Sequence, residues 1–215
     1  PFDQAPKSLV KTAQRFGGII WGNDKLALIS DSWYDTRNEK TYFFNPSNPA
    51  EAPRLVFDRN SQDLYANPGR FEMKRNQYDR RVLAIEDNKA YLIGAGHTKK
   101  GQFPFIDAMN VDSLEKTRVY QSTYTDKIEN IQSIEDFSKG DVLVQIQSKT
   151  DYPNFYFRNI KDAKLTPITQ FKNPYEGLKN VSKEVIKYKR KDGVQLSGTL
   201  YLPAGYDKTK KEKLP

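Results

Sequence analysis

The sequence predicts an all-β protein built from blades of a β-propeller, and three observations lead to this fold class. Aromatic residues, which favour pleated and half-buried surfaces, make up 13% of the chain, and glycine and proline, which mark turns, number 12 each. Short apolar runs alternate with turn signals along the first 171 residues. The same order of runs and turns occurs three times, which is typical of a repeat architecture.

Each repeat contains four predicted strands. They cover 18–21, 26–29, 41–44 and 54–57 in the first repeat, 82–85, 90–93, 103–106 and 118–120 in the second, and 131–134, 142–146, 155–157 and 165–168 in the third. From the first turn to the middle of the third strand there are 18, 16 and 15 residues (Lys25 to Phe43, Lys89 to Phe105, Asp141 to Tyr156). Four short strands in about 45 residues form a unit of propeller-blade size, whereas a β-sandwich does not require the same spacing three times.

We therefore expect about three four-stranded antiparallel units, at about 16–59, 80–122 and 128–171. The stretch 60–81 fits no strand template and is predicted to be an insertion or a long connection, with Asn67-Pro68-Gly69 as a turn and 71–74 as a candidate extra strand. Because three blades do not close a ring, further blades are expected outside this sequence. The chain opens with Pro1 and ends with Leu214-Pro215, and we expect both ends to be cut from a longer protein.

The pattern changes after Lys172. A turn-rich stretch at 173–182 is predicted to be a linker, and 185–190 reads as a strand. Asp192-Gly193 favours a tight hairpin turn. The return strand places Val194, Leu196 and every second residue to Leu202 on one face, which is the alternation of a half-buried strand.

The segment 191–207, KDGVQLSGTLYLPAGYD, followed by lysines and Leu214-Pro215, resembles the opening of the catalytic domain in the prolyl oligopeptidase family of serine peptidases. Within that family it is similar to exported Bacteroidetes members of the glutamyl-endopeptidase-like or dipeptidyl-peptidase-like type. The resemblance implies that 1–172 is a partial β-propeller, 173–182 a linker, and 183–215 the truncated first strands, including the first β-hairpin, of an α/β-hydrolase domain. It also implies an exported, periplasmic or extracellular parent protein.

The resemblance further implies a Ser-Asp-His triad with the serine in a G-x-S-x-G elbow. The sequence contains no such motif, so we assign no catalytic, cofactor-binding or metal-binding residue and expect no cofactor. The expected function is that of a non-catalytic propeller segment of a serine peptidase, inactive alone, that restricts the access of peptide substrates. Its expected partners are peptides, the remaining blades and the hydrolase domain. The alternative is a stand-alone propeller that binds proteins or glycans through exposed aromatics such as Trp21 and Trp33.

His97 is the only histidine, and it lies in a glycine-flanked loop where an ordinary loop role is favoured over catalysis. With one histidine and no cysteine, the sequence has no metal-ligand spacing. Lys139-Gly140-Asp141 is predicted to be a hairpin turn and not a phosphate loop, because no helix follows it. Asn180-Val181-Ser182 matches a glycosylation sequon, a motif frequent by chance.

Asp31 and Asp35 bracket Ser32-Trp33-Tyr34 in the loop of the first repeat. Paired carboxylates are able to do acid–base work or to hold an amino group, but capping of a turn and a strand end is the favoured interpretation. Trp33, Tyr34 and Arg37 are candidates for lining a substrate tunnel.

The net charge of +8 invites a nucleic-acid hypothesis, but its distribution argues against one. From Lys172 onward, eleven basic residues face five acidic ones, which gives +6 and leaves +2 for the first 171 residues. Nucleic-acid grooves need charge focused on one folded face, so we expect no nucleic-acid partner. No apolar run approaches the roughly 20 residues of a membrane helix, and no membrane partner is expected.

Overall fold

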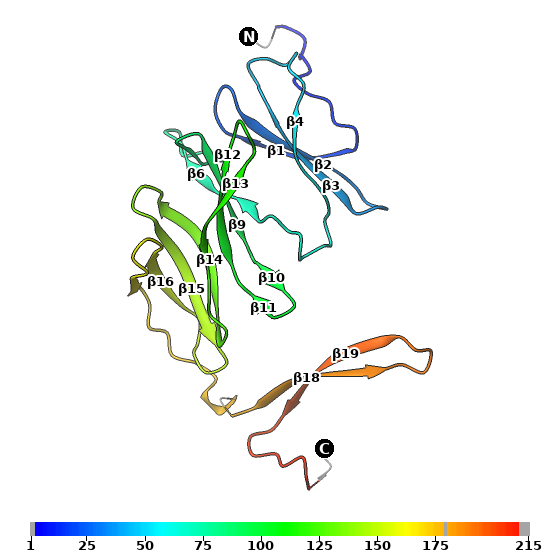
Figure 1. The fold of residues 1–215 in the computed structure, drawn as a ribbon, viewed down its shortest axis with the longest axis vertical. Coiled ribbons are helices and arrows are strands. Elements are labelled where there is room, and N and C mark those ends of the chain that lie inside the picture. The colour runs from blue at the N-terminus through cyan, green and yellow to red at the C-terminus, as the bar shows by residue number, and fades with distance from the viewer. Residues whose placement is uncertain (1–2, 179, 211–215) are drawn as a thin grey trace. The chain divides into compact units, whose positions relative to one another are not determined.

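A computed structural model describes residues 3–178 and 180–210, which fold into two compact units (Figure 1). The first unit contains the described residues up to Ser148 together with Pro153–Gln170. The second contains Lys149–Tyr152 and the described residues from Phe171 onward. Every regular element of the described chain is a β-strand except one short 3₁₀ helix, so the all-β prediction is confirmed. The described residues include no helix of the length and hydropathy needed to cross a bilayer.

The first sheet of the first unit is a four-stranded antiparallel meander, as the strand spacing predicts. Its strands are β1 (Arg15–Trp21), β2 (Ala27–Trp33), β3 (Asn38–Phe44) and β4 (Arg54–Asn60), paired in that order. The turn after β1 is held by Asn23, whose side-chain oxygen accepts the N–H groups of Lys25 and Leu26, both at 2.9 Å. This is the local chemistry that makes Asn a turn residue.

The second sheet departs from the expectation in its first strand. Its long strands are β9 (Lys89–Gly94), β12 (Phe105–Asn110) and β13 (Lys116–Gln121), and two short strands, β5 (Arg70–Phe71) and β8 (Ile85–Glu86), pair with opposite ends of β9. The predicted strand at 82–85 is divided between two short strands, and so is the candidate extra strand at 71–74. The edge strand is split, and a separate hairpin of β6 (Met73–Arg75) and β7 (Arg81–Leu83) is inserted into it.

Backbone hydrogen bonds join the inserted hairpin to the sheet. The N–H of Glu72 donates to the carbonyl of Tyr91 on β9 at 2.8 Å, and the N–H of Ala84 donates to the carbonyl of Glu72 at 3.0 Å. A second small hairpin, β10 (His97–Thr98) with β11 (Gly101–Gln102), occupies the connection from β9 to β12. The predicted strand at 103–106 accordingly begins at Phe105.

The third sheet is again a four-stranded meander and agrees with its prediction. Its strands are β14 (Lys127–Asp136), β15 (Asp141–Ser148), β16 (Asn154–Asn159) and β17 (Leu165–Pro167), paired in that order. Asp136 holds the turn between β14 and β15, because its Oδ1 accepts the hydroxyl of Ser138 at 2.6 Å and the N–H of Lys139 at 2.9 Å. The same turn contains Gly140 at φ 79°, so Lys139-Gly140-Asp141 is a hairpin turn as expected.

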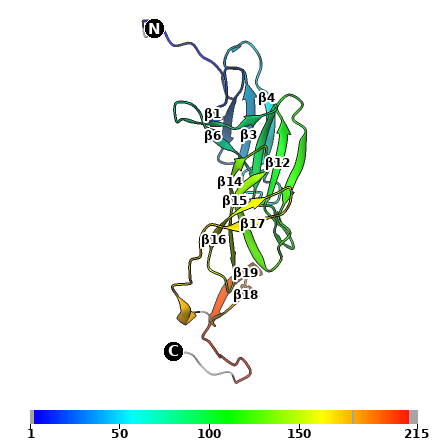
Figure 2. The same cartoon turned by 90° about the vertical axis from the view of Figure 1, so that its left-hand side faces the viewer.

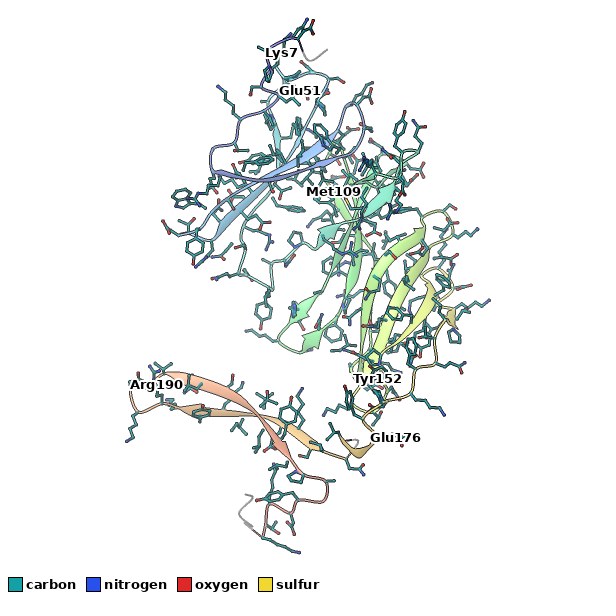
Figure 3. The ribbon with its side chains drawn as sticks, turned by 180° about the vertical axis from the view of Figure 1, so that it is seen from behind. Lys7, Glu51, Met109, Tyr152, Glu176 and Arg190 are labelled. Atoms are coloured by element: carbon teal, nitrogen blue, oxygen red, sulfur yellow. The ribbon has the colours of Figure 1, made fainter. Side chains whose placement is uncertain are left out.

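The three sheets pack face to face in chain order, which Figures 1 and 2 show as the colour runs from blue through green to yellow. The core between the first and second sheets contains Leu28, Phe43, Leu83, Leu92 and Met109. Met109 is labelled at this junction in Figure 3. The core between the second and third sheets contains Ile93, Ile106, Val142, Val144 and Ile146. Alternation along each strand thus gives the second sheet two apolar faces, one for each neighbour.

The second unit is a single hairpin preceded by a 3₁₀ turn. The 3₁₀ helix covers Glu176–Leu178, and β18 (Ser182–Lys189) pairs with β19 (Gln195–Leu202) from Ser182↔Leu202 to Lys189↔Gln195. The predicted Asp192-Gly193 turn is present, with Gly193 at φ 89° and its N–H donating to the carbonyl of Arg190 at 2.9 Å. The hairpin starts at 182, inside the predicted linker 173–182. The lysine-rich end of the predicted loop and Leu214-Pro215 lie outside the described residues.

Candidate functional site

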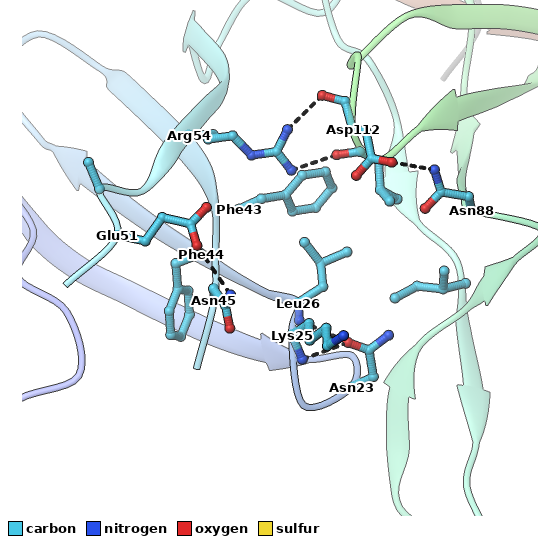
Figure 4. Close-up of a pocket in the computed structure, with 13 residues that line it drawn as sticks. Asn23, Lys25, Leu26, Phe43, Phe44, Asn45, Glu51, Arg54, Asn88 and Asp112 are labelled. Atoms are coloured by element: carbon cyan, nitrogen blue, oxygen red, sulfur yellow. Dashed lines mark hydrogen bonds between the residues drawn. The ribbon is translucent and has the colours of Figure 1, made fainter. Parts of the chain in front are cut away.

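One pocket of the first unit, of about 520 Å³, lies where turns of the first and second sheets meet (Figure 4). Leu26, Phe43 and Ile85 supply apolar walls. Arg54, the first residue of β4, donates from Nη2 to the carbonyl of Val111 at 2.6 Å and from Nη1 to the carbonyl of Asp112 at 2.7 Å.

The polar groups of this pocket are bound to one another. The side-chain amide of Asn88 donates to Asp112 Oδ2 at 2.6 Å, and that of Asn45 donates to Glu51 Oε2 at 3.2 Å. Arg54 is engaged by two carbonyls, as Figure 4 shows. Because these donors and acceptors are already satisfied, the pocket of Figure 4 serves as a junction between two sheets and offers little to a ligand.

A second pocket of the first unit, of about 540 Å³, lies at the opposite ends of the strands and is walled by all three sheets. The first sheet contributes Glu39 and Arg59, which face each other across β3 and β4. The second contributes the segment from Asn67 to Arg70, the end of β9 and Gln102 of β11. Asn130 and Ile131 of β14 complete the wall. Volumes of about 300–1,000 Å³ are those of small-ligand sites.

The charged groups of the second pocket are only partly paired. Arg59 donates from Nη2 to Glu39 Oε1 at 3.3 Å, while its Nη1 is buried and has no hydrogen-bond acceptor in the described part of the chain. Arg70 donates from Nη1 to Glu72 Oε2 at 2.9 Å and from Nη2 to the carbonyl of Gln132. Glu72 is itself buried and accepts the N–H of Ile134 at 3.1 Å, which links the second sheet to the third.

The side-chain amides of the second pocket are largely unengaged. Within residues 3–178 and 180–210, no hydrogen bond is made by the side chains of Gln102 and Asn130. Asn67 uses its side-chain oxygen to accept the N–H of Gly69 at 2.9 Å, which leaves its two amide hydrogens free. A side-chain amide offers both donors and an acceptor, so this wall is equipped to bind a polar ligand.

The sequence candidates Asp31 and Asp35 do not form a carboxylate pair. Asp31 on β2 is fully buried, and its Oδ2 accepts the N–H of Gln14 at 3.1 Å while Oδ1 has no partner in the described chain. Asp35 is exposed in the turn after β2. Burial and then the negative charge of Asp31 raise the pKa of nearby Tyr42. Asp31 is a buried strand residue, and Asp35 fits the turn role that the sequence analysis favoured.

Trp33, Tyr34 and Arg37 do lie together at one hairpin end. The guanidinium of Arg37 stacks 3.7 Å from the ring centre of Tyr34, and that of Arg15 lies 5.8 Å from the ring centre of Trp33. Tyr34 is 69% exposed and Trp33 is 43% exposed. This pair of arginine–aromatic stacks is a surface feature, and the hypothesis that it lines a substrate tunnel stays a prediction.

The remaining sequence candidates occupy ordinary structural positions. His97 opens the β10–β11 hairpin and forms no ion pair with an acid in the described residues, which also contain no cluster of three His, Asp or Glu suited to a metal. Trp21 packs edge-on against Phe44, with ring centres 6.4 Å apart. Asn180, the sequon residue, is exposed just before β18.

The sequence analysis missed the second pocket because its walls come from three separate repeats. Glu39 and Arg59 would have been a usable signal, since a four-stranded meander places them on neighbouring strands with opposite charges. Gln102 and Asn130 carry no comparable signal, because only packing of the sheets brings them to the same hollow.

No family model matches the chain. Two curated relatives align over almost all of it, both named "Probable glutamyl endopeptidase, chloroplastic". The relative from Arabidopsis thaliana is 36% identical over 226 residues and that from Oryza sativa subsp. japonica is 35% identical over 225 residues. In both cases the alignment covers 99% of this chain and 24% of the relative. The chain therefore spans about a quarter of the length of the curated relatives it matches, and those relatives are named as peptidases.

Solved structures give weaker likenesses. Oligopeptidase B from Trypanosoma brucei aligns with a TM-score of 0.48 and 10% identity, over 89% of this chain and 32% of that chain. Dipeptidyl peptidase 4 from Porphyromonas gingivalis aligns with a TM-score of 0.42 and 13% identity, over 85% and 30%. TM-scores below 0.5 do not establish a shared fold, so the sequence relatives alone bear on function.

Proposed function

We propose that this chain is a non-catalytic segment of a serine peptidase of the prolyl oligopeptidase type. The observation that carries the proposal is the 36% identity to a probable glutamyl endopeptidase, which extends over 99% of the chain. An alignment of this extent includes both the repeated sheets and the terminal hairpin. The parent protein would hydrolyse peptides, and its substrates would include peptides with glutamate.

The three stacked sheets are proposed to be blades of a propeller that restricts the access of substrates. The support is that the first and third sheets are four-stranded antiparallel meanders, that the second is antiparallel with its edge split into β5 and β8, and that each packs its apolar face on the next. On this proposal 1–172 is the partial propeller, 173–182 is the linker, and the remaining blades are partners of the first unit.

The β18–β19 hairpin is proposed to open an α/β-hydrolase domain that extends beyond this sequence. Its long strands and Asp192-Gly193 turn fit the predicted pattern. The 215 residues contain no G-x-S-x-G motif, so the serine, aspartate and histidine of the triad would be supplied by the rest of the parent protein. The plant relatives are named as chloroplastic, whereas for this protein we propose export on the strength of the sequence resemblance.

The test begins with the coding sequence downstream of residue 215, where a G-x-S-x-G motif followed by Asp and His is expected. The full-length protein should cleave fluorogenic peptides after glutamate and lose this activity when a fluorophosphonate modifies its serine. Residues 1–215 alone should show no turnover. Absence of the motif, or activity of the 215-residue chain alone, would refute the proposal. Fractionation of the native host tests export.

A binding scaffold without catalysis is the second candidate, and the exposed stacks of Arg15 on Trp33 and Arg37 on Tyr34 favour it. Tyrosine and tryptophan are enriched at interfaces, because each ring combines an apolar body with a polar group. Glycan-array binding by a full-length protein that has no peptidase activity would support the scaffold. Peptide turnover combined with no glycan binding would exclude it.

A further inference from the structure

We propose that the second pocket, lined by Arg59, Arg70, Gln102 and Asn130, binds the carboxylate side chain of an acidic peptide. This inference rests on the proposed function for the source of the ligand, since a peptidase acting at glutamate meets such peptides. It adds a binding site that lies in the blades themselves. The inference rests on the volume of the pocket, on its side-chain amides that have no hydrogen bond within the chain, and on the two arginines in its wall.

The two pockets of the first unit have similar volumes but differ in whether their polar side chains are already hydrogen-bonded within the chain. In the pocket of Figure 4, Arg54, Asn88 and Asn45 all donate to carbonyl or carboxylate oxygens of the chain. In the second pocket, the amides of Gln102 and Asn130 make no hydrogen bond within the described residues. These amide atoms are accessible to water, so a polar ligand would replace water there and not a protein partner. Unused donors and acceptors that line one hollow therefore indicate a site for an external polar group.

The arginines determine which polar group fits. Arg59 uses one nitrogen for Glu39 and has no acceptor in the described chain for the buried Nη1. Arg70 reaches the same hollow with half of its side chain exposed. A guanidinium presents several donors in a plane and pairs well with the two oxygens of a carboxylate. A carboxylate in the pocket would pair with the exposed part of Arg70 and be attracted by the positive charge of Arg59, whose buried Nη1 it would reach only after the side chain shifts.

The amides favour a peptide over a free anion. Gln102 and Asn130 come from different sheets, on β11 and β14, and each offers a donor and an acceptor. A peptide group presents the complementary N–H and carbonyl on either side of the carboxylate-bearing residue. An inorganic anion would leave the acceptor oxygens of both amides unused. The pocket is thus suited to an acidic residue within a chain.

The experiment measures binding of two fluorescein-labelled peptides, Ala-Ala-Glu-Ala-Ala and Ala-Ala-Gln-Ala-Ala, by fluorescence anisotropy. The full-length protein is first treated with a fluorophosphonate so that turnover does not consume the peptide. Gln102→Glu introduces a carboxylate of nearly the same shape into the pocket. The matched control is Gln77→Glu, because Gln77 is exposed in the turn between β6 and β7 and does not line the pocket.

We expect the unmodified sequence to bind the glutamate peptide more tightly than the glutamine peptide, by about tenfold for a charge-assisted hydrogen bond. Gln102→Glu should remove most of this preference, because the new carboxylate repels the ligand and occupies Arg59. Gln77→Glu should leave it unchanged. Arg59→Gln should also abolish the preference, provided that circular dichroism shows the fold is retained.

Equal affinity for the two peptides, or an equal effect of the two glutamine variants, would overturn the inference. The outcome is separable from that of the proposed function. Hydrolysis of peptides without a Gln102-dependent preference would leave the peptidase proposal standing and refute the pocket. A Gln102-dependent preference in a protein without hydrolysis would support the pocket and refute the peptidase.

Discussion

Glu129 on β14 and Arg158 on β16 form an ion pair buried in the first unit, from two strands that flank β15 in the third sheet. The carboxylate also accepts the hydroxyl of Tyr120 on β13 at 2.6 Å, and the guanidinium donates to the hydroxyl of Tyr124 at 2.8 Å. The tyrosines belong to the core between the second and third sheets. A buried polar network therefore joins two sheets whose core is mainly apolar.

Replacing Glu129 by Gln should lower the free energy of unfolding by about 3–5 kcal/mol, because it leaves Arg158 buried without a counter-charge. The measurement is urea unfolding followed by circular dichroism. The control is Glu86→Gln in the exposed Lys74–Glu86 pair, where a loss of at most about 1 kcal/mol is expected. Equal losses at the two sites would show that the Glu129 pair is not buried in solution.

A double replacement separates the net contribution of the ion pair to the free energy of unfolding from the penalty of leaving one charge buried and unpaired. Glu129→Leu combined with Arg158→Leu should be less destabilising than either single change, since no charge is then left unpaired. The comparison is a double-mutant cycle on the free energies of unfolding. Additive losses would contradict direct coupling between the two side chains.

Tyr120 makes the contribution of the network to stability depend on pH in the alkaline range. Burial raises the pKa of the Tyr120 hydroxyl, and its hydrogen bond to Glu129 and the negative charge there raise the pKa further. An unfolded tyrosine has a pKa of about 10. Above that pH the unfolded chain loses this proton while the folded chain keeps it, so the contribution to stability is complete below about pH 10 and is lost as pH rises toward the folded pKa.

Tyr120→Phe should therefore reduce the fall in stability as the pH rises above about 10. Below that pH the variant should be less stable by about 1 kcal/mol, for the lost hydrogen bond. Urea unfolding at several pH values measures both effects. The exposed Tyr65 supplies the control Tyr65→Phe, which should leave the pH profile unchanged. Parallel profiles for the original protein and Tyr120→Phe would refute the assignment.

Leu83 tests whether the inserted β6–β7 hairpin is part of the core. Its side chain is 1% exposed and packs in the cluster between the first and second sheets. Leu83→Ala should lower the free energy of unfolding by about 2–5 kcal/mol through loss of burial and the cavity left behind. Leu55→Ala on β4, where the side chain is 47% exposed, should cost less than about 1 kcal/mol. A small effect at both positions would mean that the hairpin is peripheral.

The strands of the first and third sheets were predictable because their signals are local. Asn23 and Asp136 mark turns by bonding the next few backbone N–H groups, and apolar runs of four or five residues follow. The split edge of the second sheet was not predictable in this way. Arg70-Phe71 is too short to show a strand pattern, and only its pairing with Ile93 and Leu92 makes it one.

The candidate site shows the same difference between features with a local sequence signal and features formed by long-range contacts. Trp33, Tyr34 and Arg37 are neighbours in sequence, so their grouping was visible, and the structure adds the stacking of Arg37 on Tyr34. The second pocket depends on contacts between repeats, such as that between Arg70 and the carbonyl of Gln132, 62 residues away. Periodicity and composition carry no information on such contacts.

Gly69, which lines the second pocket, lies very close to the backbone of Ile93. It has φ +93°, and a Cβ there would lie 2.5 Å from the carbonyl oxygen of Ile93. Gly193 in the β18–β19 turn has nearly the same φ, +89°, but a Cβ there would meet nothing within 4 Å. The two glycines therefore share a conformational cost of substitution and differ in steric cost.

Gly193→Ala should destabilise by about 1–2 kcal/mol, the penalty of a side chain in left-handed backbone. Gly69→Ala should cost about 1–3 kcal/mol more, because the backbone of Ile93 has to move. It should also weaken binding of the glutamate peptide, since that movement displaces the wall of the pocket, while Gly193→Ala should not. Thermal unfolding and peptide anisotropy on both variants provide the comparison. Equal destabilisation by the two substitutions would show that Gly69 is required only for its φ angle.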